Sequence, residues 1–437
     1  MRASSVMMAF AGLAAAKQLY RGVAIAGADF GCDIDGSCDT SQVVFPIHDI
    51  GDVDGAAQMR HFAHDDGLNM FRLPISWQFL TAHRGGSDLD KDGFEKYKKL
   101  MQACLDTGAY CQIDLHNFAR FDNGIVGQGG PSNDVFAKLW TNIAAPWKDN
   151  DHVVFGLMNE PHDLDIQAWA DTCQHVVNEL RKSGAESQMI LLPGTNFTNS
   201  ATMIENGSAE SMLAITNPDG STDNLLLDIH QYLDIDNSGQ HVECVRDNAD
   251  SFERLADYLR KRDRQGMISE TGASSDSSCI KMFCSQTDAI LRNSDVYVGL
   301  VGWSAGSFKL DYIMTMTPRW ENGKFINNEL FTQCLVEKWA NEPEKTTSIT
   351  KSKSKTTTTT KHSSTETSES ITTTTDAAET TSADLMAVES DSVTSTNEQS
   401  AEETGGTSGA SALRLGESMT LAKLLSGCMA AIVIYAL

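Results

Sequence analysis

Two glutamates stand where apolar segments of the sequence end. Glu160 lies in the stretch VVFGLMNEPHD (153–163), directly after Asn159, and Glu270 lies in GMISETG (266–272). The apolar first half of each stretch is typical of a strand buried on both faces. A polar ending has an ordinary explanation, since Asn and Pro often form the turn that closes a strand. The chemical explanation is that two carboxyl groups facing across a cleft can hydrolyse a glycosidic bond, one as proton donor and one as nucleophile or base.

Other polar and aromatic side chains occupy the same relative position at the ends of other apolar runs. They are Arg72, His116, Asn117, His230, Tyr232 and Trp303. Each alone has an ordinary explanation, such as an ion pair, a core imidazole or a capping ring, but their shared position indicates one site. There Arg72 and Asn159 could hold charge and a sugar hydroxyl. Tyr232 could hydrogen-bond the nucleophile, and the face of Trp303 suits a sugar ring.

Eight short apolar runs carry these residues. They cover residues 21–27, 69–76, 109–117, 152–161, 188–194, 225–233, 266–272 and 296–303. Amphipathic stretches of helical period lie between most of them, and this alternation predicts parallel strands joined by helices. Eight such units favour a closed (β/α)8 TIM barrel over an open doubly wound sheet, because six strands would suffice there and no G-x-G-x-x-G follows the first run.

In such a barrel the active site lies at the carboxyl ends of the strands, where the side chains named above would meet. Asp114 and Asp228 stand two residues before predicted strand ends. We therefore interpret them as polar groups lying deeper in the barrel.

Composition divides the chain near residue 341. Residues 342–408 are mostly Thr, Ser, Glu and Lys, and such a segment cannot bury enough apolar surface to offset its ordering entropy. We expect one catalytic domain at residues 17–341, followed by a disordered Ser/Thr-rich stalk.

Both ends of the sequence carry targeting patterns. Residues 1–16 contain an arginine, an apolar run and small residues, which predicts a signal peptide; a buried first helix is the alternative. The small-residue cluster GGTSGASA (405–412), a polar spacer and an apolar tail predict a glycosylphosphatidylinositol (GPI) anchor signal at residues 409–437, with attachment at Ser408 or Gly409. The apolar stretch is fourteen residues long, which is shorter than the about 20 residues of a usual membrane-spanning helix. A short membrane helix is the alternative interpretation. The predicted location is outside the cell, anchored at the surface or wall.

The ten cysteines fit a secreted protein. Cys428 falls in the anchor signal, and Cys173 lies on the apolar stripe of a predicted helix, so eight remain for pairing. No C-x-x-C spacing indicates a metal site, and we expect no cofactor. The formal net charge of -25 argues against a nucleic-acid partner.

The motifs taken together resemble the fungal endo-β-1,4-glucanases of glycoside hydrolase family 5. They are RLP, DLHN, MNEPHD, DIHQYLD, SETG and VGWSAGSF, with the longer stretches GAYCQIDLHNFARF, GIVGQGGPSND and LDIDNSGQH. The resemblance implies that Glu160 is the acid/base, Glu270 the nucleophile, and Asn159 the residue that binds the sugar 2-hydroxyl. The remaining residues of the family's site match Arg72, His116, His230, Tyr232 and Trp303.

The resemblance also implies four disulfides and a free, buried Cys173. The implied pairs are Cys32–Cys38, Cys104–Cys111, Cys244–Cys279 and Cys284–Cys334. Many relatives carry a cellulose-binding module before the barrel, whereas here we expect the barrel to start within a few residues of the predicted signal cleavage; the anchor-like tail is a second departure. Asn196 and Asn206 stand in N-glycosylation sequons.

The resulting hypothesis is a monomeric, retaining endo-β-1,4-glucanase acting on cellulose or soluble β-glucan. Alternatives are a hydrolase of mannan, xyloglucan or mixed-linkage glucan, or a non-catalytic wall-binding protein. We expect the two carboxyl groups about 5 to 5.5 Å apart, as in retaining enzymes. We also expect a raised pKa of Glu160, caused largely by repulsion from Glu270.

Overall fold

Eight parallel strands form a closed barrel in the computed structural model, which describes residues 19–47 and 53–340. The strands are β1 (Tyr20–Ala26), β2 (Met70–Ile75), β3 (Tyr110–Leu115), β6 (Val153–Gly156), β7 (Ile190–Leu192), β8 (Leu225–Tyr232), β9 (Gly266–Gly272) and β10 (Tyr297–Gly306). Each pairs with its neighbour in sequence, and β10 closes the ring against β1. The predicted (β/α)8 barrel is confirmed.

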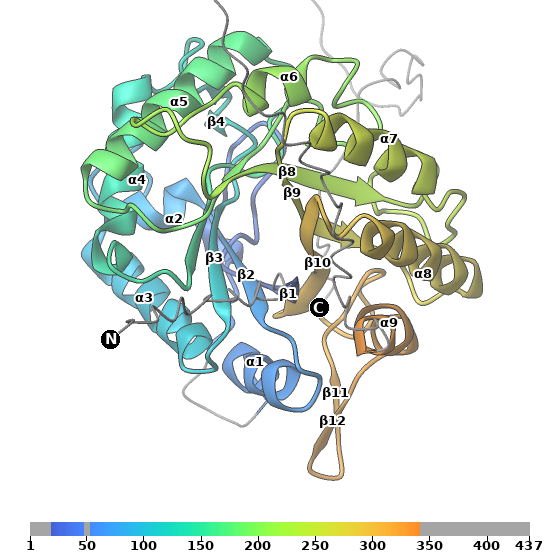
Figure 1. Cartoon of the computed structure of the whole chain (residues 1–437). Helices are drawn as coiled ribbons and strands as arrows, with labels where there is room; N and C mark the ends of the chain where they lie inside the picture. Colours follow the sequence, from blue (N-terminus) through green and yellow to red (C-terminus); the bar gives the residue numbers. More distant parts are fainter. Residues whose placement is uncertain (1–18, 48–52, 341–437) are drawn as a thin grey trace, which may run out of the picture. The chain divides into compact units, whose positions relative to one another are not determined.

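Helices surround the barrel (Figure 1). They are α1 (Gly55–His64), α2 (Trp77–Thr81), α3 (Lys91–Leu105), α4 (Asn133–Ala144), α5 (Ile166–Lys182), α6 (Ser208–Leu213), α7 (Ala249–Arg260), α8 (Ser277–Arg292) and α9 (Lys338–Ala340), with short 3₁₀ turns at Thr40–Gln42 and Ala145–Trp147. Asp or Ser side chains cap most of the longer ones; for example, Asp90 accepts a hydrogen bond from the Gly93 amide and Asp165 from the Ala168 amide. These caps satisfy amides that have no partner within the helix.

An apolar plug fills the barrel near the amino ends of its strands. Its members are Met70, Val154, Met189, Leu191, Leu226, Met267, Val298 and Val301, all buried. Because alternate residues of a strand share a face, β8 places Leu226, Asp228, His230 and Tyr232 in turn along the barrel interior. The interior therefore changes from apolar to polar towards the carboxyl ends, where the sequence predicted the site.

Two hairpins and a C-terminal segment complete the described chain. The hairpins are β4–β5 (Arg120–Phe121, Gly124–Ile125) and β11–β12 (Arg319–Glu321, Lys324–Ile326), and the second projects beside α1 (Figure 1). The π-helical segment Phe331–Glu337 leads into α9. Within residues 19–47 and 53–340, no helix is long and apolar enough to cross a bilayer. The predicted signal peptide, stalk and anchor signal lie outside the described residues.

Four disulfides join neighbouring elements. They are Cys32–Cys38, Cys104–Cys111, Cys244–Cys279 and Cys284–Cys334, the pairs that the family resemblance implies. Cys173 in α5 is free and buried, and burial raises the pKa of its thiol. It is therefore a core side chain and a poor nucleophile.

The disulfides close chain loops of very different length, which predicts different contributions to stability. The Cys284–Cys334 bond spans 50 residues and the Cys104–Cys111 bond spans 7. The entropy lost by the unfolded chain predicts that Cys284→Ala/Cys334→Ala lowers the free energy of unfolding by about 4 kcal/mol and Cys104→Ala/Cys111→Ala by about 2 kcal/mol. Urea unfolding of both double variants measures this. Equal losses would show that loop length does not govern the effect.

Candidate active site

A cavity of about 420 Å³ opens at the carboxyl ends of the strands. Six of the predicted site residues line it: His116, Asn159, Glu160, Tyr232, Glu270 and Trp303. Arg72 and His230 are not on its surface; both are 1 % exposed and contact the two glutamates directly. The structure thus brings together all eight residues that the sequence assigned to the site.

The expectation that all these residues lie at strand ends is wrong for several of them. Arg72 is the third residue of β2, and Glu270 and Trp303 lie within β9 and β10. The strands continue because pairing continues: His230 is in register with Glu270, and Tyr232 with Gly272. His116, Asn159 and Glu160 do follow the ends of their strands.

Asn117, which the sequence also placed at a strand end, has a structural role. Its side chain accepts a hydrogen bond from the Trp77 amide at 2.7 Å and donates to Gln78 Oε1 at 2.8 Å. These bonds fix the start of α2 under the cleft wall.

Glu160 and Glu270 face each other closely. One carboxylate oxygen of each lies within 4.8 Å of the other. Inverting glycosidases separate their carboxyl groups by about 6.5 to 9.5 Å, and retaining ones by about 5 to 5.5 Å. This close approach of the two carboxylates fits the narrow spacing better than the wide one.

Glu270 contacts a hydrogen-bond donor and a cation. Tyr232 Oη donates to Glu270 Oε1 at 2.6 Å, and Arg72 Nη1 forms an ion pair with Glu270 Oε2. Both oxygens of the Glu270 carboxylate are therefore occupied by donors from the protein. Burial and the nearby carboxylates raise the pKa of Tyr232 well above its usual value, so the phenol keeps the proton that it donates.

Glu160 is held as an acid. Burial, followed by repulsion from Glu270, raises the pKa of Glu160 well above its usual range. The direction matches the expectation, but the order of causes does not: burial contributes more than repulsion because Glu160 is 1 % exposed. Glu160 also has a backbone φ of 43°, a left-handed conformation that costs about 1 kcal/mol for a residue with a side chain.

Arg72 connects Glu270 to the opposite wall. Its Nη2 donates to Asn159 Oδ1 at 2.7 Å and lies 2.9 Å from Asp114 Oδ2. Asp114 in turn contacts His116 Nδ1 at 2.8 Å. Burial opposes ionisation of Asp114, but Arg72 and His116 outweigh it and the pKa of this carboxyl lies below its usual value.

Behind Glu160, a buried chain of hydrogen bonds leads into the barrel. His230 Nδ1 lies 2.9 Å from Glu160 Oε1, and His230 Nε2 lies 3.0 Å from Ser269 Oγ. Ser269 donates to Asp228 Oδ1. Burial raises the pKa of Asp228 to about 7, although the Ser269 hydrogen bond opposes the shift. Burial and then Arg72 lower the pKa of His230 well below its usual value, so His230 is neutral.

This chain can hold a proton at either end. When Ser269 donates to Asp228, its oxygen accepts from His230 Nε2, which leaves Nδ1 free to accept from a protonated Glu160. When the three bonds reverse, Asp228 carries the proton and His230 donates to an ionised Glu160. Both states of Glu160 are therefore satisfied without a charge on the imidazole.

A bulge in β9 makes this arrangement fit. Adjacent residues of a regular strand point to opposite faces, yet Ser269 reaches Asp228 while its neighbour Glu270 reaches the cleft. The register of β8 against β9 shifts by one residue between Ile229 and His230, opposite Ser269. Such an extra residue redirects the side chains around it.

Sequence reasoning missed several residues of the site. Ser269 was not singled out, and Asp114 and Asp228 were interpreted only as deeper polar groups. The missed lining residues include Asp29, Phe30, Phe118, Phe308 and Tyr312. Trp303 Nε1 donates to Tyr312 Oη at 3.2 Å, and the rings of Phe308 and Tyr312 stack with centroids 3.9 Å apart. The stretch VGWSAGSF was a signal for Phe308, but these loop residues carry no strand pattern.

The comparisons agree with this geometry. Residues 35–309 match the family described as Cellulase (glycosyl hydrolase family 5). The chain belongs to glycosyl hydrolase family 5. Endoglucanase EG-II of Hypocrea jecorina is 46 % identical over 324 residues, covering 73 % of this chain and 78 % of that protein. Endoglucanase 1 of Saitozyma flava is 43 % identical over 312 residues, covering 71 % of this chain and 87 % of that protein.

A solved family 5 structure has the same fold. The crystal structure of Cel5A (EG2) from Hypocrea jecorina superposes with a TM-score of 0.71 at 45 % identity, covering 74 % of this chain and 99 % of that one. The barrel and its cleft are therefore those of a family 5 glycosyl hydrolase.

The order of causes for Glu160 can be tested by removing the neighbouring charge. In Glu270→Gln, the pKa of Glu160 should fall because the repulsion is lost, but it should stay above the usual value of about 4.3 because burial remains. Carbon-13 NMR titration of labelled glutamate carboxyls measures this, with Glu160→Gln to assign the signal. A return to the usual value would show that repulsion is the main cause.

Proposed function

We propose that the protein is a retaining endo-β-1,4-glucanase, with Glu160 as acid/base and Glu270 as nucleophile. The observation that carries the proposal is the close pair of carboxyl groups with opposite surroundings. Glu270 is paired with Arg72 and Tyr232, whereas Glu160, among the residues that the structure describes, has its side-chain hydrogen-bond contact with the neutral His230. Two residues of one type are thereby given two chemical tasks.

In the first step Glu270 attacks the anomeric carbon while the proton of Glu160 passes to the leaving oxygen. The glycosidic bond breaks and a glycosyl ester forms on Glu270. The negative charge of Glu270 is consumed, and a new charge appears on Glu160. The imidazole can stabilise this charge in its Nδ1–H tautomer, with Ser269 donating to Nε2; this moves one proton from Nε2 to Nδ1 and needs no additional proton.

In the second step Glu160 acts as a base. It takes a proton from a water molecule, whose oxygen attacks the anomeric carbon and releases Glu270. The configuration of the sugar is retained, and Glu160 is again protonated. Because the first step needs protonated Glu160, activity should be lost as the pH rises through its raised pKa.

The proposed substrate is internal β-1,4-linked glucan. The relatives at 46 % and 43 % identity are both named endoglucanases. Trp303 on the cavity wall stacks with His116 at 5.4 Å between centroids and offers an apolar surface to a sugar ring. Rates on cellulose, mannan, xyloglucan and mixed-linkage glucan would test the choice; a preference for mannan would contradict it.

The division of labour predicts different defects in two variants. Glu160→Ala should slow cellulose cleavage by about 10²- to 10⁴-fold, the usual contribution of a positioned acid/base, but a substrate with a good leaving group should still form the glycosyl-enzyme. Glu270→Ala should abolish that covalent step with either substrate. Steady-state rates and mass-spectrometric labelling by a fluorosugar measure the two effects.

Glu253→Ala is a suitable control, since it removes a surface glutamate paired with Arg292. It should label and cleave as the unaltered protein does. If Glu160→Ala blocked labelling and Glu270→Ala did not, the two roles would be reversed.

We propose further that the enzyme is secreted and anchored at the cell surface. The four disulfides fit an oxidising compartment, while the signal peptide, stalk and GPI anchor rest on sequence pattern alone. Of the two sequons, Asn196 is the better glycosylation site. Its side chain is exposed, whereas Asn206 Nδ2, the atom that would bear the glycan, is inaccessible.

The anchor predicts a specific release experiment. Phosphatidylinositol-specific phospholipase should release active enzyme from intact cells, because the lipid would be the remaining membrane attachment once residues after Ser408 or Gly409 are removed. Activity in the supernatant and C-terminal peptide mapping measure this. A mature membrane-bound peptide containing Leu437 would exclude the anchor.

A further inference from the structure

A third carboxylate lines the catalytic cavity and has no part in the two chemical steps. Among the described residues on the cavity wall, the acidic ones are Asp29, Glu160 and Glu270. Asp29 follows the end of β1, at a point where Ala28 still pairs with Ile75 of β2. Asp29 therefore lies at the same end of the barrel as the two catalytic glutamates.

One oxygen of Asp29 is fixed by the backbone. Oδ1 accepts a hydrogen bond from the Gly27 amide at 2.7 Å. Gly27 has a φ of 138°, and a Cβ at this residue would lie 2.2 Å from the carbonyl oxygen of Val44, so only glycine fits the close approach of the two segments. The Val44 amide in turn donates to the Gly27 carbonyl at 3.1 Å. The Asp29 carboxylate is thus held in place before any ligand binds.

The other oxygen of Asp29 is available to a ligand in the cavity. Asp29 is 6 % exposed and lines the cavity, so the little surface that it exposes lies there. No other residue in the described part of the chain donates to Oδ2. A largely buried acceptor without a donor is unfavourable. A hydroxyl group entering the cavity would supply the missing donor.

Asp29 is close to both residues that contact the Trp303 indole. His116 stacks on Trp303 with ring centroids 5.4 Å apart, and Tyr312 Oη accepts from Trp303 Nε1 at 3.2 Å. Burial opposes the charge of His116, but Asp114 and also Asp29 raise its pKa. Burial raises the pKa of Tyr312, and the charge of Asp29 adds to that shift. The carboxylate of Asp29 therefore stands beside the Trp303 ring.

An aromatic ring with an acceptor beside it suits a glucose unit. The hydroxyl groups of a β-linked glucose unit are equatorial, so they point outward from the edge of the sugar ring, while its faces carry C–H groups. The faces pack on aromatic side chains. The hydroxyl groups need acceptors, and a carboxylate oxygen forms the stronger, charge-assisted kind of hydrogen bond. Trp303 can provide the surface for the face, and Asp29 the acceptor at the edge.

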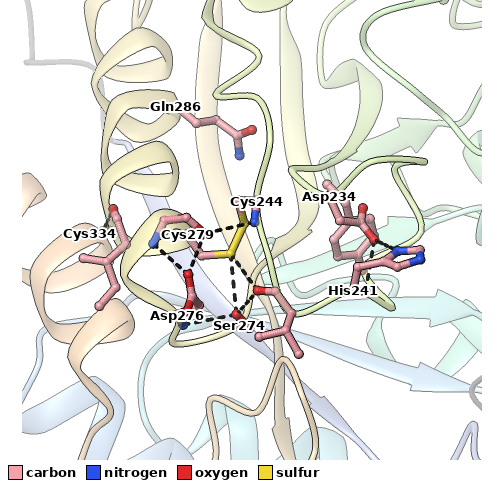
Figure 2. The surroundings of a disulfide bond; sticks show 12 residues. Asp234, His241, Cys244, Ser274, Asp276, Cys279, Gln286 and Cys334 are labelled. Carbon is pink, nitrogen blue, oxygen red and sulfur yellow. Dashed lines mark hydrogen bonds and ion pairs between the residues drawn. A yellow bond between two sulfur atoms is a disulfide. The ribbon is translucent and has the colours of Figure 1, made fainter.

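A second buried aspartate, Asp234, lies in the loop after β8 and has different surroundings. Its Oδ2 accepts from the Gln240 amide at 3.0 Å and from Ser238 Oγ at 3.1 Å, and lies 2.9 Å from His241 Nδ1 (Figure 2). Ser238 and Gln240 line the cavity, but Asp234 does not. Asp234 therefore stabilises its own loop, whereas Asp29 has an acceptor left for the cavity.

Building on the glucanase function proposed above, we propose that Asp29 is a substrate-binding residue. Its Oδ2 accepts a hydrogen bond from a hydroxyl group of the glucose unit that packs on Trp303. Asp29 has no contact with Glu160 or Glu270 among the hydrogen bonds and ion pairs of the described residues, so it acts on the affinity for the glucan and not on the reacting bond.

Binding can be measured apart from turnover. Glu270→Gln replaces the nucleophile by an amide, and in this parent variant the binding of cellotetraose is measured by calorimetry. Adding Asp29→Ala should weaken binding about 10- to 100-fold, the usual contribution of a hydrogen bond to a charged group. Adding Asp29→Asn should weaken it less, because the amide oxygen can still accept from Gly27 and the amide nitrogen can donate to a sugar oxygen.

Cellotetraoses that each lack one hydroxyl group identify the contact. In the parent variant, one of these deoxy sugars should bind more weakly by the same factor as Asp29→Ala causes. In the Asp29→Ala variant that deoxy sugar should bind as well as cellotetraose, because the partner of the missing hydroxyl is already absent. A purely structural role of Asp29 would lower the affinity for every sugar of the series by one factor.

Asp219→Asn is the matched control. Asp219 also accepts from a backbone amide in a loop, that of Ser221 at 2.9 Å, but it does not line the cavity. In the same parent variant it should leave the affinity for cellotetraose unchanged. Circular dichroism checks the fold of each variant, and if Asp29→Ala did not fold, Asp29→Asn with the deoxy series would replace it.

The outcomes separate this inference from the proposed function. Unchanged affinity in Asp29→Ala, or equal losses for all the deoxy sugars, would overturn the role of Asp29 and leave the glucanase proposal intact. Failure of the parent variant to bind cellotetraose would contradict the glucan substrate, and the role of Asp29 with it.

Discussion

The buried guanidinium of Arg72 is the interaction on which the rest of the site depends. It lies in the barrel interior at 1 % exposure and contacts Glu270, Asp114 and Asn159. Burial opposes its charge, but Asp114 and Glu270 together raise its pKa, so it remains a cation. A buried charge is tolerated only where such partners surround it, and removing one partner leaves the other uncompensated. The positions of three strands are thus tied to a single positive charge.

The same charge explains the asymmetry between the two glutamates. Arg72 forms an ion pair with Glu270, while Glu160 lies against an imidazole that burial and Arg72 keep neutral. Burial and repulsion from Glu270 together outweigh the opposing charge of Arg72, which is why the pKa of Glu160 is raised. The different surroundings of the two carboxyl groups follow from which of them Arg72 contacts.

Much of the fold could be predicted because the barrel leaves a strong pattern in the sequence. Each barrel strand packs against helices on its outer face and against side chains of the other strands on its inner face, so it appears in the sequence as a continuous apolar run. All eight runs were visible. The polar residues that interrupt these runs were equally visible. Strand lengths could not be predicted in the same way. For example, β10 continues past Trp303 to Gly306 through pairing with β1, which lies almost three hundred residues earlier in the chain.

The parts of the site that escaped prediction depend on register and burial. Nothing in SETG distinguishes a regular strand from a bulge, so the inward turn of Ser269 became visible only with β8 beside it. The causes of the raised pKa of Glu160 could not be ranked from the sequence either, because burial depends on the elements that surround the residue.

The Cys284–Cys334 disulfide has a mechanical consequence. It joins α8 to the last π-helical segment of the described chain, and Lys338 Nζ adds a contact to Asp288 Oδ2 at 2.6 Å. Tension on the polypeptide beyond Ala340 would act first on α9 and the Lys338 contact, and the Cys334 bond to α8 would then carry it into the barrel covalently. An enzyme tethered from that side could bear shear from a moving polysaccharide while its cleft, at the mouth of the barrel, kept its shape.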